Sequence, residues 1–116
     1  MKYLFTSMPV VSHLLPLVPL ASQLVLDGHD VLVATCGPAA DAARQAGLTT
    51  IDAGGRHDAR APYDRLLKII DEGGAGRGPV DEDSLALHGE YFGDVGLRML
   101  DDLLDIGSLW GADAVV

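Results

Sequence analysis

Short apolar segments alternate with longer segments of helical periodicity along the first half of the chain. Strands are predicted at 2–6 ("KYLFT"), 30–35 ("DVLVAT") and 48–53 ("LTTIDA"), because each is a short apolar run with little polar alternation. Helices are predicted between them, from Pro16 to Leu26 and over 38–47, each closed by a glycine. This order predicts a Rossmann-like α/β fold, in which a parallel sheet carries helices on both faces.

The second half of the chain is predicted to be mostly helical. An amphipathic helix is expected over 63–72, a mobile glycine-rich surface loop over 73–79, and one or two helices, weakened by three internal glycines, over 81–105. The last residues, 112–116 ("ADAVV"), read as the beginning of another strand. Because the sequence stops inside that strand, we expect residues 1–116 to be one incomplete N-terminal domain of a larger protein.

Composition narrows the classes of partner. The 116 residues are 48% hydrophobic and 22% charged, as in an ordinary globular domain, and the formal net charge is −9. An acidic surface repels nucleic-acid phosphates and anionic lipids, so neither nucleic acid nor a membrane is an expected partner. There is no signal-peptide pattern, no long apolar run and a single cysteine, so we expect a soluble, cytoplasmic protein.

Several cofactor and metal sites can be tested against the sequence. A dinucleotide fingerprint needs glycines directly after the first strand, but that turn reads "SMPVVS" and Pro9 lacks an N–H group. The segment "DEDSLALHGEYF" begins like a calcium loop but has Ala86 where the sharp turn needs glycine. His57 and His88 lack neighbours at metal-ligand spacing. We therefore expect no metal and no cofactor.

His13 is the polar residue with the most informative position. Pro16 suits the first position of a helix, which places His13 just before that helix, at the carboxyl end of the first strand. Ligands of open α/β sheets collect at this edge, and the positive end of the helix dipole favours a neutral imidazole that can accept a proton. The alternative is a ring that only caps backbone groups. Position alone does not decide between them.

Three stretches carry a resemblance to a known family. They are "SHLLPLVPLA", "DGHDVLVAT" and "QAGLTTIDAGG", and together they span most of residues 1 to about 55. These stretches resemble the N-terminus of family 1 glycosyltransferases, most of all bacterial enzymes that glycosylate macrolides, enediynes and other polyketides. Ser12 stands where that family usually has glycine, and the later residues match only loosely.

The resemblance implies a GT-B fold, in which two Rossmann-like domains face each other across a cleft. Residues 1–116 would be the acceptor-binding domain, and a C-terminal domain absent from this sequence would bind most of the nucleotide sugar. The implied reaction moves a sugar, with inversion, from a dTDP- or UDP-sugar to a hydroxyl of a hydrophobic natural-product aglycone, as in antibiotic biosynthesis. His13 falls on the family's general base, and no metal is needed.

The residues around His13 suggest an apolar acceptor pocket. Met8, Val10 and Val11 flank the base, Ser12 adjoins it, and Phe92 is a further candidate wall. Two other classes stay open: a non-catalytic helper or binding module, and the acceptor-side chain of a split glycosyltransferase. A homodimer is also compatible with the sequence.

An acidic partner of His13 is expected outside this sequence. An imidazolium formed during the reaction needs a hydrogen-bond acceptor on its other nitrogen. Asp27 and Asp30 are predicted at the opposite end of the sheet and Asp113 at the start of its strand. The resemblance places the acidic partner after this last strand, so we expect an Asp or Glu within about ten residues beyond Val116.

Overall fold

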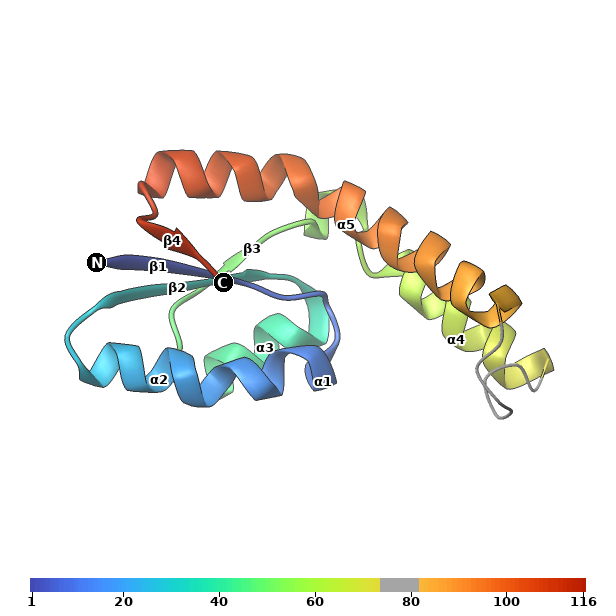
Figure 1. The fold of residues 1–116 in the computed structure, drawn as a ribbon, viewed down its shortest axis with the longest axis horizontal. Coiled ribbons are helices and arrows are strands. Elements are labelled where there is room, and N and C mark those ends of the chain that lie inside the picture. The colour runs from blue at the N-terminus through green and yellow to red at the C-terminus, as the bar shows by residue number, and fades with distance from the viewer. Residues whose placement is uncertain (74–81) are drawn as a thin grey trace.

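A parallel sheet forms the centre of the molecule. The computed structural model describes residues 1–73 and 82–116, and in these residues four strands pair in the order β3-β2-β1-β4 (Figure 1). Every pair is parallel, which confirms the predicted Rossmann-like α/β fold. The strands are β1 (Lys2–Thr6), β2 (Asp30–Thr35), β3 (Thr50–Asp52) and β4 (Ala114–Val115).

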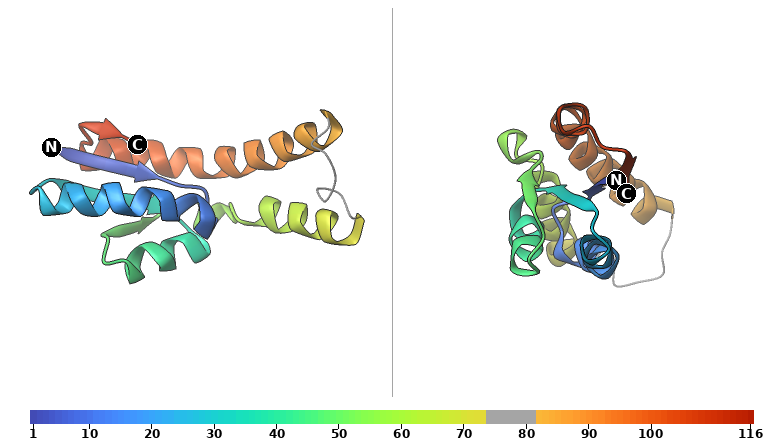
Figure 2. Two further views of the ribbon diagram at one scale, coloured as in Figure 1. Left: turned by 60° about the horizontal axis from the view of Figure 1, so that its bottom comes forward. Right: turned by 90° about the vertical axis from the view of Figure 1, so that its left-hand side faces the viewer.

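Helices cover both faces of the sheet, as predicted. One face carries α1 (Val11–Leu14), the 3-10 turn η1 (Leu15–Leu17), α2 (Val18–Leu26) and α3 (Gly37–Gln45). The other face carries the C-terminal half of α5 (Glu82–Trp110). The N-terminal half of α5 runs beside α4 (Ala61–Gly73), and this helical pair extends past the carboxyl ends of the strands (Figures 1 and 2). A 3-10 turn, η2 (Gly55–His57), joins β3 to α4.

The strand side chains alternate between two apolar clusters because successive residues of a strand point to opposite faces. Leu4, Leu32 and Ala34 belong to the cluster under α5, which also buries Val95 and Met99 of that helix. The cluster on the opposite face is built from β1, β2, helices α1 to α3 and the segment between α3 and β3. Its buried members are Phe5, Leu14, Ala21, Val31, Val33, Ala39, Ala43 and Leu48.

The first helical segment begins earlier than predicted. Val10 has an extended backbone, and its carbonyl accepts the N–H groups of both His13 and Leu14, so the first helical turn starts at Val11 rather than at Pro16. His13 therefore lies inside this turn, not before it. Pro16 cannot donate to the carbonyl four residues back, and the chain tightens around it into a 3-10 turn before α2 begins.

Other boundaries differ modestly from the predictions. α3 begins one residue early and ends at Gln45, β3 keeps only three of the six predicted residues, and α4 begins at Ala61. Most of the predicted loop 73–79, and Asp81, lie outside the described residues. α5 is one helix that reaches Trp110. Three of its four glycines are exposed where an added Cβ would meet nothing, so those three lower helix propensity without disturbing the buried side.

Candidate active site

The loop between β1 and α1 lies at the carboxyl edge of the sheet and is fixed by side chains from two other elements. The Thr35 hydroxyl, at the end of β2, donates to the carbonyl of Ser7 at 2.7 Å. The guanidinium of Arg60, just before α4, donates to the carbonyl of Pro9. Val10 N–H donates to Met8 O at 2.7 Å. Ser7, Pro9 and Val10 are buried, so both packing and hydrogen bonds hold this loop in place.

His13 is exposed on the turn that follows this loop. Its backbone N–H donates to the Val10 carbonyl at 3.0 Å. Its ring lies 6.0 Å from the ring of Phe92, measured between centroids, with an angle of 49° between the two planes. Within residues 1–73 and 82–116, neither ring nitrogen of His13 takes part in a hydrogen bond or ion pair, so the alternative of a backbone-capping ring finds no support.

Three aromatic rings gather on the helical pair, and one of them, Phe92, lies beside His13; we call Tyr63, His88 and Phe92 the aromatic cluster. The Phe92 centroid lies 6.2 Å from that of Tyr63 and 6.0 Å from that of His88. His88 Nδ1 also lies 2.7 Å from the carbonyl of Ser84, one turn earlier in α5. All three rings are half-buried. Through Phe92, His13 is thus joined to two further half-buried rings beyond the carboxyl ends of the strands.

The sequence-predicted site residues fall into three groups. His13 and Phe92, which are far apart in the sequence, are brought together. Met8 is half-buried against the core under α5, and Val10 is buried with 6% of its surface exposed, so Val10 offers almost no surface to a ligand. Val11 is half-buried and Ser12 exposed, on the turn that carries His13.

Sequence reasoning missed two members of the aromatic cluster and two residues that anchor the loop. His88 is spaced one helical turn from Phe92, a signal that could have joined them to one helix face. Tyr63 and Arg60 reach the site only through the turn of the chain into α4, and Thr35 reads as an ordinary strand residue. No local pattern identifies those three.

Cys36, which follows β2, is a free and buried thiol. Burial raises the pKa of its thiol to about 11, and the carboxylate of Asp52 adds to the effect. A thiolate is the reactive form of cysteine, so this raised pKa disfavours a nucleophilic role for Cys36, which packs in the apolar cluster under α5.

The described part of the chain holds no group of three or more His, Cys, Asp or Glu side chains that could bind a metal ion. Nor does any described helix combine the length and the apolar character needed to cross a membrane.

No protein-family model matches this chain, but solved structures of other proteins do. The glycosyltransferase SnogD from Streptomyces nogalater is 30% identical, with a TM-score of 0.74 over 99% of this chain and 27% of SnogD. SsfS6, a glycosyltransferase of Streptomyces sp. SF2575, is 29% identical, with a TM-score of 0.75 over 99% of this chain and 32% of SsfS6. The chain is similar to bacterial natural-product glycosyltransferases.

This likeness confirms the family resemblance expected from the first 55 residues and extends it over almost the whole chain. The spinosyn forosaminyltransferase SpnP is 31% identical, with a TM-score of 0.61. The sheet and its helices correspond to the N-terminal part of the GT-B fold of such natural-product glycosyltransferases. The chain spans about a quarter to a third of the length of these three enzymes, between 24% and 32%.

Proposed function

We propose that this chain is the acceptor-binding part of an inverting glycosyltransferase. The enzyme would transfer a sugar from a dTDP- or UDP-sugar to a hydroxyl of a hydrophobic natural-product aglycone, with His13 as general base. The observation that supports the proposal is the exposed His13 ring at the carboxyl end of β1, 6.0 Å from the half-buried Phe92 ring of an aromatic cluster. Reactive groups and ligands of open α/β sheets meet at this edge.

The proposed chemistry uses His13 to remove one proton. The imidazole takes the proton of the acceptor hydroxyl while its oxygen attacks the anomeric carbon, and the nucleoside diphosphate leaves from the opposite side of the sugar. Attack opposite to the leaving group inverts the anomeric centre. A positioned base contributes a rate factor of about 10²–10⁴ to such a step.

The acceptor would rest between the turn that carries His13 and the aromatic cluster. Phe92 and Tyr63 offer ring faces, and Met8 and Val11 offer apolar surface nearby, which suits a hydrophobic aglycone better than a free sugar. Ser12, exposed beside the base, offers a hydroxyl to polar groups of the acceptor. For the donor, SsfS6 has been crystallised with thymidine diphosphate, and we propose the same class of nucleotide here.

A chimera tests the proposal. Residues 1–116 would replace the corresponding part of SnogD, which supplies the rest of a glycosyltransferase. We expect His13→Gln to lower turnover at least about 100-fold with donor affinity unchanged. His29→Gln is the matched control, because His29 lies at the amino end of β2, with its ring 5.2 Å from Tyr3. Near-normal turnover of the His13 variant in an active chimera would contradict its role as base.

The 116-residue chain by itself gives a second arm of the test. We expect it to show no transfer and no specific binding of a dTDP- or UDP-sugar, because the proposed donor site lies outside it. Calorimetry that detected micromolar binding of such a donor would contradict the proposed division of labour between the two domains.

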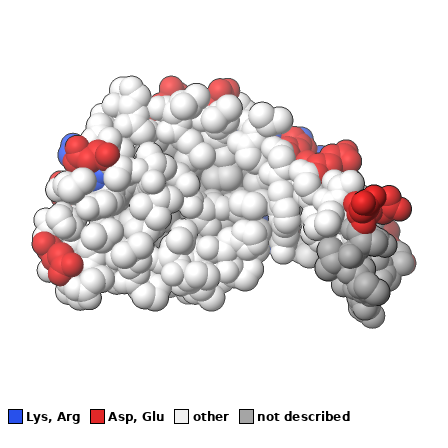
Figure 3. Space-filling model, in the orientation of Figure 1, with Lys and Arg blue, Asp and Glu red and all other residues white. Residues whose placement is uncertain are grey.

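A second candidate is the acceptor-side chain of a split enzyme, or a helper that acts only by association. This candidate is favoured by an apolar groove of about 360 Å³ between α5 and the β4 edge. The groove is lined by Leu4, Leu103, Leu104 and Val115, among others. Leu104 and Val115 are 62% and 66% exposed, and most charged side chains on the face drawn in Figure 3 lie toward its periphery. Sedimentation of the chain with and without a donor-binding polypeptide would test this candidate. A chain that remains monomeric in both would count against it.

A further inference from the structure

Arg60 makes three contacts from its position just before α4. Its Nη1 donates to the carbonyl of Pro9, in the loop that precedes His13. Its Nε donates to Asp64 Oδ1 at 2.8 Å, and the guanidinium carbon lies 5.0 Å from the centre of the Tyr63 ring. The Arg60 side chain is only 26% exposed, so most of it is held between the loop and the helix.

Together with the ring contacts, these bonds connect the loop before His13 to α4 and α5. Arg60 joins the loop at Pro9 to α4, and Tyr63 of α4 stacks on Phe92 of α5 with an angle of 18° between the rings. Phe92 in turn faces His13, whose backbone N–H returns to Val10, the neighbour of Pro9. Arg60 is thus the link between the loop that precedes His13 and the helix that carries Tyr63.

We propose that Arg60 is a positioning residue that holds the His13 turn against the aromatic cluster. The inference rests on the proposed function for the role of His13 as base. Arg60 acts on the backbone of the loop and on the face of Tyr63, and in the part of the chain that the structure describes no hydrogen bond or ring contact joins it directly to His13 or Phe92. It therefore sets the geometry in which an acceptor meets the base.

The chemistry of the guanidinium explains why arginine stands here. Its planar fork donates to Pro9 and to Asp64 while its face lies on Tyr63, and a lysine ammonium is a point charge that cannot do all three. The Asp64 carboxylate is 56% exposed, so that ion pair contributes little energy. The bond to the carbonyl of buried Pro9 and the contact with Tyr63 carry the positioning.

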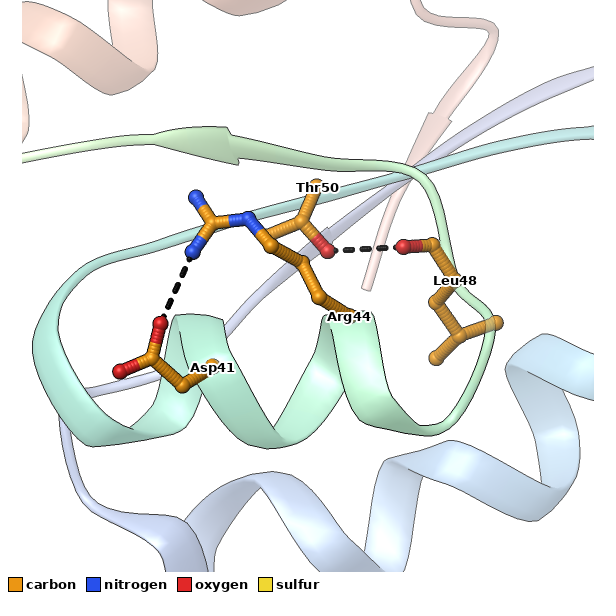
Figure 4. Close-up of polar contacts among 4 residues, drawn as sticks. All are labelled: Asp41, Arg44, Leu48 and Thr50. Carbon is orange, nitrogen blue, oxygen red and sulfur yellow. Dashed lines mark hydrogen bonds and ion pairs between the residues drawn. The ribbon is translucent and has the colours of Figure 1, made fainter.

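Arg44 of α3 offers a matched control. Like Arg60 it pairs with an aspartate one helical turn away, Asp41, at 3.1 Å (Figure 4). Among the described residues, the side chain of Arg44 makes polar contacts only within α3. The other bond drawn in Figure 4, from the Thr50 hydroxyl to the Leu48 carbonyl, does not involve Arg44. Replacing Arg44 thus removes an arginine and its ion pair without cutting a link between elements.

The experiment is nuclear magnetic resonance of the 116-residue chain. The His13 ring signals are assigned by their disappearance in His13→Gln, and two quantities are followed: the nuclear Overhauser effect between the His13 and Phe92 rings, and the ring-current shift of His13. We expect Arg60→Met to abolish the first and reduce the second, Arg60→Lys to restore both in part, and Arg44→Met to leave both unchanged. Circular dichroism and the amide signals of α2 and α3 report whether the fold is intact.

Each outcome bears on the proposal. An unchanged contact between His13 and Phe92 in folded Arg60→Met overturns it, and so does an equal loss in Arg44→Met. If Arg60→Met does not fold, Arg60→Lys decides: unaltered His13 signals in that variant overturn the proposal. None of these readouts needs sugar transfer, so failure of the proposed function is seen separately, as normal turnover of the His13→Gln chimera.

Discussion

The two faces of the sheet are held by different kinds of contact. Against α2 and α3 the packing is apolar, and the fully buried Ala39 and Ala43 let α3 lie close to the strands. Against α5 the apolar cluster is joined by a buried carboxylate, Asp102, whose Oδ2 accepts the N–H of Gly54 at 2.6 Å. Asp102 Oδ1 also pairs with Arg56. Apolar contacts are non-directional, whereas these bonds are directional.

The difference matters because α5 carries part of the candidate site. Phe92 lies on the same helix as Asp102, and the bonds of Asp102 fix where that helix lies along the junction of β3 and η2. The Asp102 anchor thus helps to hold the helix that brings the Phe92 ring to within 6.0 Å of the His13 ring. The turn that carries His13 lies on the apolar face, and its polar anchors are the bonds of Thr35 and Arg60 to the preceding loop.

Removal of the anchor is expected to have the largest effect. Asp102→Ala leaves the N–H of buried Gly54 without a partner and frees Arg56, so the free energy of unfolding should fall by about 3 kcal/mol. Asp102→Asn keeps one acceptor oxygen and should lose less. Urea denaturation measures both against Asp105→Ala, an exposed carboxylate on the same helix, which should change stability by less than about 0.5 kcal/mol. Equal losses at the two aspartates would remove the distinction between the faces.

The apolar face could be predicted from the sequence because its rules are local. Strands β1 and β2 have the predicted bounds, and each end of α3 lies within two residues of its predicted position. These three elements follow from short-range periodicity and from the glycine and proline residues at their ends. The boundary at Pro16 was wrong because the extended backbone of Val10, in a loop held by Thr35 and Arg60, sets the start of the helix. Those two anchors come from distant parts of the chain.

The face under α5 could not be predicted in full, because its polar contacts join Asp102 to residues far away in the sequence. Asp102 stands beside Asp101 and near Asp105, and only the approach of η2 to α5 makes one of the three buried. His13 and Phe92 were each predicted as site residues, from a strand end and from aromatic character, but their contact depends on the helical pair. Tyr63 and His88 join them only in three dimensions.

A pair of glycines tests the close packing under α5. Gly54 and Gly47 both have positive φ, +96° and +79°, so alanine strains the backbone at each. A Cβ at Gly54 would lie 2.7 Å from Ala59 Cβ and 2.8 Å from Met99 Cγ, whereas at Gly47 it would meet nothing within 4 Å. Gly54→Ala should therefore destabilise the chain by about 2 kcal/mol more than Gly47→Ala in thermal or urea unfolding. Similar losses would indicate that α5 yields easily to a clash.

The smallest expected effect concerns Cys36, a buried thiol on the same face. Its folded-state pKa, about 11, lies above the ordinary value of 9.0, because burial and the Asp52 carboxylate disfavour the thiolate. The unfolded chain therefore releases the thiol proton first as the pH rises. This contribution to stability is fully present below about pH 9 and is lost progressively as the pH rises through about 11.

The loss can be isolated from other alkaline effects by comparison with Cys36→Ala. Between about pH 8 and about pH 10 the native chain should lose about 1 kcal/mol more unfolding free energy than the alanine variant, measured by urea denaturation under reducing conditions. Tyrosine and lysine titrate in both proteins and cancel in the difference. Parallel pH profiles for the two proteins would mean that the α5 face opens enough to solvate the thiolate, and the face anchored by Asp102 would then be less tightly closed than the buried Cys36 and Met99 indicate.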